Sequence, residues 1–144
     1  TTPLMRELEK YAVRVGGGNN HRFNLSDGIL IKDNHIIAAG GIKDAMRKAM
    51  VVKTALVKIG VEVKNFEELK EAIESGADHI MLDNMKPEEV LNAVSFVNKR
   101  VTIEVSGGIT PDNIEEYAKC LPNYISLGFI THSARAVDIS LELK

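Results

Sequence analysis

Two glycine-bearing turns follow strand-like apolar runs late in the sequence. Ser106, Gly107 and Gly108 come directly after the run at residues 101–105, and Gly128 ends the run that begins at residue 124. Glycines allow backbone N–H groups to approach a phosphate closely, and the N-terminus of a following helix adds positive potential. The pattern therefore favours a phosphate site, while tight turns without a ligand are the alternative.

Two carboxylates stand at corresponding ends of neighbouring apolar runs. Glu62 and Asp83 are 21 residues apart, and each lies within or just after a run. Side by side, two carboxylates could hold Mg²⁺, bind sugar hydroxyls or act as an acid/base pair. This pairing alone does not distinguish those roles from two solvated acids in loops.

Cationic side chains occur in two segments near the first run. His21 and Arg22 follow a triple glycine, and Lys32 follows the run at residues 28–31. Such a set suits an anionic substrate, because arginine can bind a carboxylate through two parallel N–H groups. Ordinary surface charge is the alternative. His35 is expected to cap or pack against a helix, and His79, at the opposite edge of the sheet, is expected to be structural.

The elements that must position these side chains repeat along the chain. Strand-like runs start 29, 22, 22 and 23 residues apart, at residues 28–31, 57–63, 79–82, 101–105 and 124–127. This spacing is typical of βα units in a parallel sheet. It predicts an α/β fold with five or six parallel strands in one domain over residues 1–144, since residues 139–143 also alternate like a strand. An open doubly wound sheet and part of a barrel both remain, and both place active sites at the carboxyl ends of the strands.

Helix signals lie between the runs. Residues 3–15 are expected to form a helix that ends at the triple glycine. Asn65 is a good N-cap, and Lys86-Pro87 and Thr110-Pro111 are typical of a first helical turn.

Composition excludes several classes of protein. The chain has 144 residues, 44% of them apolar and 26% charged, which is typical of a folded domain but short of a complete eightfold barrel at ~250 residues. Eighteen Lys and Arg against 20 Asp and Glu leave a net charge of −2, so no basic field for nucleic acid or a membrane surface is expected. No apolar run is long enough to span a membrane. The single cysteine, Cys120, excludes an internal disulfide, suits a reducing, cytoplasmic compartment and is no candidate nucleophile.

A series of motifs carries a resemblance to a known family. In chain order they are Glu9-Lys10-Tyr11-Ala12-Val13, Gly16-Gly17-Gly18-Asn19-Asn20-His21-Arg22, Leu25-Ser26-Asp27-Gly28, Ile31-Lys32-Asp33-Asn34-His35, Leu82-Asp83-Asn84, Glu104-Val105-Ser106-Gly107-Gly108-Ile109 and Thr131-His132-Ser133-Ala134. From Thr1 to Lys144 the sequence resembles the carboxyl-terminal domain of quinolinate phosphoribosyltransferase, the nicotinate-nucleotide pyrophosphorylase (carboxylating) family. The resemblance implies an incomplete TIM-like α/β barrel preceded by an amino-terminal α/β domain.

The resemblance also implies an activity. The family transfers a phosphoribosyl group to quinolinate from phosphoribosyl pyrophosphate, using Mg²⁺, and yields nicotinate mononucleotide, CO₂ and pyrophosphate for NAD biosynthesis. The matching positions are His21, Arg22 and Lys32 around the quinolinate carboxylates; Glu62 and Asp83 near the ribose hydroxyls and the metal-bound pyrophosphate, so that they contact Mg²⁺ indirectly; and Ser106, Gly107, Gly108 and Gly128 at the 5′-phosphate. Lys32, Glu62 and Asp83 are the expected catalytic residues.

The sequence departs from the family pattern in three ways. An Arg-Lys pair expected just before Thr1 is missing, as are the amino-terminal domain and the first barrel strands. The neighbouring subunit's domain that covers the family's site is missing with them. Gly60 stands where a glutamate is expected, and no feature of the sequence explains it.

These departures predict a carboxyl-terminal portion of the enzyme, either a fragment or part of a longer chain. We expect it to have negligible activity alone and to form a homodimer or higher oligomer. A non-catalytic barrel fragment that retains phosphate affinity is the alternative. A related phosphoribosyltransferase with another acceptor is disfavoured by His21, Arg22 and Lys32.

Overall fold

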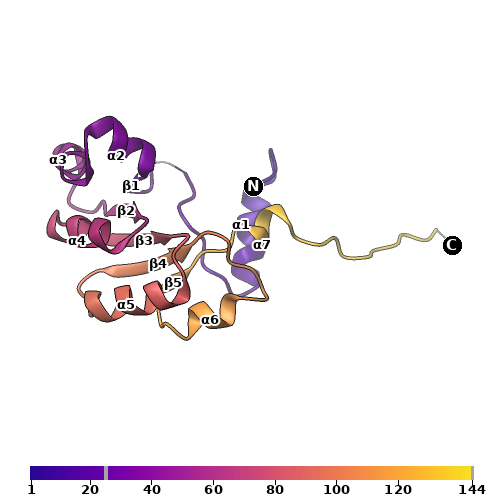
Figure 1. The fold of residues 1–144 in the computed structure, drawn as a ribbon. Coiled ribbons are helices and arrows are strands. Elements are labelled where there is room, and N and C mark those ends of the chain that lie inside the picture. The colour runs from indigo at the N-terminus through magenta and orange to yellow at the C-terminus, as the bar shows by residue number, and fades with distance from the viewer. Residues whose placement is uncertain (25, 144) are drawn as a thin grey trace. The chain divides into compact units, whose positions relative to one another are not determined.

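The computed structural model describes residues 1–24 and 26–143, which belong to two compact units (Figure 1). One unit comprises Thr1–His21 with Gly128–Lys144, and the other comprises Arg22–Leu127. Each unit is described by itself. The expectation of a single domain therefore stays a prediction.

The Arg22–Leu127 unit is built on one parallel sheet. Its strands are β1 (Ile29–Ile31), β2 (Ile59–Val63), β3 (His79–Asp83), β4 (Thr102–Ser106) and β5 (Tyr124–Ile125). They lie in the order β1-β2-β3-β4-β5, and every neighbouring pair is parallel. The five predicted parallel strands are thus confirmed. A doubly wound sheet reverses its strand order at a switch point, whereas the order here is that of successive βα units in a barrel wall.

Helices of this unit pack on an apolar face of the sheet. They are α2 (Asp33–Ala39), α3 (Ile42–Val52), α4 (Phe66–Glu74), α5 (Pro87–Val97) and α6 (Ile114–Ala118). Val61, Ile80 and Val105 are fully buried in a core with Leu69 of α4 and Val90 of α5, and most of the residues that alternate with them are polar. Because successive side chains on a strand point to opposite faces, the polar residues between them share the second face.

Local signals set most helix starts. The Asn65 side chain accepts a hydrogen bond from the Glu68 N–H at 2.9 Å, and Pro87 is the first residue of α5, both as predicted. The start expected at Thr110 is wrong, because α6 begins at Ile114. The Asn113 side chain explains the delay: its Oδ1 accepts from the Thr110 N–H at 2.8 Å and its Nδ2 donates to the Gly108 carbonyl at 3.0 Å. These bonds hold residues 110–113 as a turn.

The other unit contains two helices, α1 (Arg6–Val15) and α7 (Phe129–His132). Helix α1 ends before Gly16 as predicted, but it begins at Arg6 rather than Pro3. Residues 139–143 form no strand, contrary to their alternating pattern. A strand requires a partner for its N–H and C=O groups, and none of the described strands pairs with this segment. Within the described residues, no helix is long and apolar enough to cross a bilayer.

Candidate active site

The carboxyl ends of the strands place an ion pair at the edge of the polar face. Ile31 and Val61 are partners in the sheet, so the next residues, Lys32 and Glu62, lie side by side. Lys32 Nζ is 3.0 Å from Glu62 Oε2, and the side chains are 49% and 9% exposed. Two of the three residues predicted to be catalytic are therefore in contact, and the lysine neutralises a buried carboxylate.

A second lysine, which sequence reasoning missed, lies at the same edge. Lys64 Nζ is 3.0 Å from Asp33 Oδ2. The Lys64 hydrogen bond, helped by the Asn34 N–H, holds the pKa of Asp33 below its ordinary value. The bond to Asp33 raises the pKa of Lys64, and the negative charges of Asp83 and Glu62 raise it further. Lys64 follows Glu62 by two residues, so strand alternation was the signal that could have found it.

Asp83 and the Ser106 turn meet at the ends of β3 and β4. Asp83 is the register partner of Ser106. The next N–H, that of Asn84, donates to the Ser106 carbonyl at 2.9 Å. A Cβ at Gly107 would lie 2.6 Å from Asn84 Cγ and 2.9 Å from Asn84 N. Asn84 therefore requires the glycine, and it too was missed as a site residue, because the contact joins positions far apart in sequence.

The turn after β4 presents a run of backbone donors. Gly107 and Gly108 both have left-handed backbone angles, with φ of 93° and 63°. Over residues 1–24 and 26–143, the N–H groups of Gly107, Gly108 and Ile109 donate to no acceptor of the chain. Successive N–H groups in such a turn form a concave anion-binding site. The donors come from the turn itself, since α6 begins only at Ile114.

Arg22 contacts the backbone on the side of β1 that faces away from β2. Its Nη1 donates to the Gly28 carbonyl at 2.8 Å. The Ile29 N–H donates to Lys58 on the β2 side, and a trans peptide points its carbonyl the opposite way, so the Gly28 carbonyl faces outward. Arginine has five N–H donors, of which this bond uses one. The contact of Arg22 with a substrate carboxylate stays a prediction.

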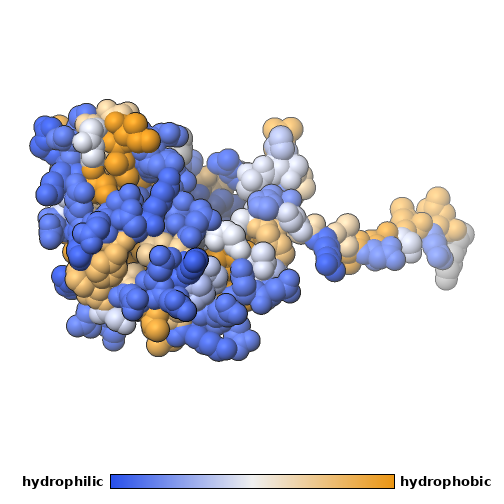
Figure 2. Space-filling model, viewed as in Figure 1, coloured by the Kyte–Doolittle hydropathy of each residue, from blue (hydrophilic) through white to orange (hydrophobic). Residues whose placement is uncertain are grey.

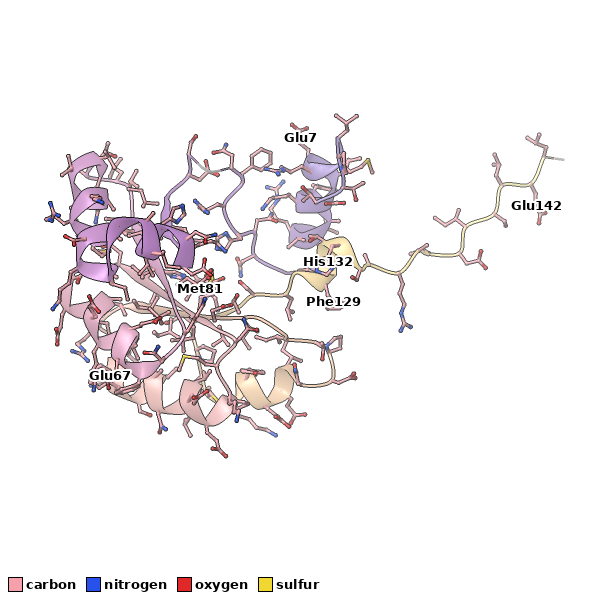
Figure 3. All side chains as sticks on the ribbon, turned by 45° about the horizontal axis from the view of Figure 1, so that its top comes forward. Glu7, Glu67, Met81, Phe129, His132 and Glu142 are labelled. Carbon is pink, nitrogen blue, oxygen red and sulfur yellow. The ribbon has the colours of Figure 1, made fainter. Side chains whose placement is uncertain are left out.

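Two predicted site residues belong to the other unit. The His21 carbonyl accepts a hydrogen bond from Lys10 Nζ at 3.0 Å. Gly128 directly precedes α7, where a Cβ would lie 3.0 Å from His132 Nε2. Figure 3 labels His132 and Phe129 on this helix. The glycine thus leaves room for the His132 imidazole.

The remaining singled-out side chains have structural contacts. His35 Nδ1 accepts from the Lys32 N–H at 3.0 Å, which confirms its predicted capping role. His79 Nε2 is 2.7 Å from Glu104 Oε2, and Ser126 Oγ donates to the other oxygen of that carboxylate. Burial raises the pKa of the Cys120 thiol, which keeps it protonated.

The described residues offer no complete metal cage. In this part of the chain, no three His, Cys, Asp or Glu side chains lie close enough together to hold a metal ion. Glu62 is already paired with Lys32, which leaves Asp83 as the carboxylate beside the Ser106 turn. A site of this kind fits a cation whose other ligands come from a bound phosphate.

Comparisons with known proteins identify the family of this chain. The family model described as quinolinate phosphoribosyl transferase, C-terminal domain, matches residues 1–142. The probable nicotinate-nucleotide pyrophosphorylase (carboxylating) of Methanocaldococcus jannaschii is 51% identical over 99% of this chain and 53% of its own length. The Bacillus subtilis protein of the same name is 50% identical, over 99% and 50%.

Solved structures give the same result. NadC from Streptococcus pyogenes is 44% identical with a TM-score of 0.93, covering 99% of this chain and 50% of its own. The nicotinate-nucleotide pyrophosphorylase from Francisella tularensis is 46% identical with a TM-score of 0.92, covering 97% and 50%. The chain spans about half the length of the curated relatives it matches. It belongs to the quinolinate phosphoribosyl transferase C-terminal domain family.

Proposed function

We propose that this chain forms the catalytic half of a quinolinate phosphoribosyltransferase. The reaction converts quinolinate and phosphoribosyl pyrophosphate to nicotinate mononucleotide, CO₂ and pyrophosphate, a step of NAD biosynthesis. The observation that carries the proposal is the turn at residues 106–109, whose three backbone donors lie beside Asp83. The names of the chain's relatives support the same activity.

The turn would bind the 5′-phosphate of the substrate. Ser106 would bind the phosphate together with Gly107 and Gly108. The N–H groups of Gly107, Gly108 and Ile109 are donors that the fold holds in place before the ligand arrives. Gly128 is the further phosphate-binding residue that the family resemblance implies. Preformed donors of this kind cost little reorganisation when an anion binds.

Charge stabilisation would drive the chemistry. As pyrophosphate leaves, positive charge develops on the ribose and negative charge on the leaving group. Glu62 and Asp83 would face the ribose side, and Lys32 would stabilise the anionic groups. Mg²⁺, when bound, would take up charge of the leaving pyrophosphate. Phosphate oxygens would hold it, and Glu62 and Asp83 would contact it indirectly, through the bound phosphoribosyl pyrophosphate.

Cationic side chains would select the acceptor. Quinolinate carries two adjacent carboxylates, and His21, Arg22 and Lys32 would bind them from two segments of the chain. The Lys32 ammonium is held by Glu62 and remains half exposed, so it can also approach an anion. Decarboxylation would then follow on the cationic pyridine ring, which accepts the electron pair.

Further strands would complete a TIM-like barrel that includes this sheet.

Copies of the protein would also associate with one another. Figure 2 shows apolar side chains gathered over α2 and α3, where Ile37, Val51 and Val52 are 77%, 82% and 70% exposed. Exposed apolar patches of this kind favour association. We expect a homodimer or higher oligomer in the cytoplasm, where a reducing environment suits the free Cys120 thiol. Sedimentation of a stable monomer at high concentration would contradict the association.

The activity is tested by joining the chain to the part of a relative that it does not match. We would join this chain to the amino-terminal half of the 50% identical Bacillus subtilis relative and measure nicotinate mononucleotide formation. The joined protein should form nicotinate mononucleotide, and the chain alone should not. In the joined protein, Asp83→Asn should lower the turnover rate more than it lowers quinolinate affinity. Phosphate binding without turnover, while a rejoined Bacillus subtilis control is active, would favour the non-catalytic alternative.

A further inference from the structure

A buried carboxylate on the polar face of the sheet contacts both His79 and Ser126. Glu104 is 3% exposed, and in the described structure only Glu62 shares its status as a buried charged residue. His79 Nε2 is 2.7 Å from one oxygen of Glu104, and Ser126 Oγ donates to the other. Each of the two buried acids on this face thus has a basic neighbour, Lys32 for Glu62 and His79 for Glu104.

These contacts join the two ends of the sheet. His79 is level with Thr102, near the amino ends of the strands. Glu104 is level with Met81, which Figure 3 labels on β3. Val105 pairs with Ile125, so Ser126 is level with Ser106, where the phosphate turn begins. The Glu104 carboxylate therefore lies one layer of side chains below that turn.

Gly60 makes room for the histidine. Gly60 and His79 are register partners, and a Cβ at Gly60 would lie 3.3 Å from His79 Cδ2 and 3.1 Å from Leu30 Cδ1. Glycine inside a strand weakens it, so its presence here needs a reason. The His79 imidazole and the Leu30 side chain supply that reason, because a Cβ at Gly60 would press on both.

We propose that His79, as an imidazolium, neutralises Glu104 and so prevents this buried carboxylate from repelling the anion bound at residues 106–109. The inference rests on the proposed phosphate site. Charges interact more strongly where water is excluded, so removing a cation from beside Glu104 leaves more negative charge one layer below the turn and weakens anion binding there. The other charged groups that the structure describes at the carboxyl edge are Lys32, Asp33, Glu62, Lys64 and Asp83. His79 is a positioning residue that acts through Glu104.

Titration of the full chain with inorganic phosphate, followed by NMR at the Gly107, Gly108 and Ile109 amides, tests the charge. His79→Leu should weaken binding about tenfold, or ~1.4 kcal/mol. His79→Gln keeps a hydrogen-bond donor without the charge and should weaken binding as much. The double variant His79→Leu/Glu104→Gln should regain the parent's affinity, because it lacks both charges. If His79 has only a structural role, His79→Gln should bind phosphate as the parent does, and the double variant should bind it most weakly.

The outcomes separate the inference from the proposed function. If the parent binds phosphate and the His79 variants bind equally well, the inference is wrong and the phosphate site stands. If phosphate does not change the chemical shifts of these amides in the parent, the proposed phosphate site itself is wrong. Thermal unfolding gives a readout without phosphate: His79→Leu should destabilise the parent more than it destabilises the Glu104→Gln chain. Equal effects in both backgrounds would show that His79 does not neutralise Glu104. Should His79→Leu fail to fold, His79→Gln carries the same comparison.

Discussion

The side chain of Asn84 occupies the space that a Cβ at Gly107 would need. Gly107→Ala should therefore cost about 2–4 kcal/mol, from the left-handed backbone and from the clash together. Gly76→Ala is the matched control, because Gly76 has a φ of 83° but its Cβ would meet only Met50 Cε at 3.4 Å. The control should cost about 1 kcal/mol. Denaturant unfolding measures both, and equal losses would contradict the close contact.

The Lys32–Glu62 pair should stabilise the fold by a modest amount. Lys32→Met leaves a buried carboxylate without its ammonium, and we expect a loss of ~1–2 kcal/mol. This is less than for a fully buried pair, because the lysine is half exposed. Lys70→Met removes the 3.2 Å pair with Glu67, whose side chain is 82% exposed, and should change stability by under ~0.5 kcal/mol. Adding Glu62→Gln to Lys32→Met should restore part of the lost stability. A further loss of stability would contradict the stabilising role of the Lys32–Glu62 pair.

Asp78 should make the fold sensitive to acid. Burial acts to raise its pKa, but hydrogen bonds from Lys53 and the Ile59 N–H outweigh burial and hold the pKa below its ordinary value. A lowered pKa contributes stability above the unfolded value of ~3.9, and this contribution is lost as pH falls through the folded value. Asp78→Asn should lower the melting temperature at neutral pH by a few degrees. The difference from the parent should shrink in acid, and a constant difference across the pH range would contradict this linkage.

Cys120 should be unreactive in the folded chain. Burial raises the pKa of its thiol, so less of the reactive thiolate is present at any given pH. Its Sγ also contacts the Pro87 carbonyl at 3.2 Å. An aromatic disulfide reagent should label the native chain far more slowly than the chain unfolded in guanidinium chloride. Equal rates in the two states would place the thiol at the surface.

Features encoded by neighbouring residues could be predicted from the sequence. The strand repeat, the Asn65 cap, the Pro87 start and the His35 cap each depend on residues within one element or its flanks. The strand run expected at residues 124–127 is shorter, since β5 is Tyr124–Ile125.

Features that depend on contacts between distant residues could not be predicted. Lys64 matters because Asp33, 31 residues away in sequence, lies beside it. Nothing in its own strand explains Gly60, and the explanation comes from Leu30 and His79 on the neighbouring strands. The delayed start of α6 likewise depends on which way Asn113 turns its amide. Sequence patterns identify the edge of the sheet that carries the site, and the structure shows which side chains meet there.

The strand order β1-β2-β3-β4-β5 has a consequence for how the chain folds. Each strand pairs with the strand next to it in sequence, and the partners lie about 20 to 30 residues apart. The entropy lost on closing a loop grows only with the logarithm of its length, and short sequence separations speed folding. No pairing has to wait for a distant segment. The sheet can grow one βα unit at a time, in the order in which the units leave the ribosome.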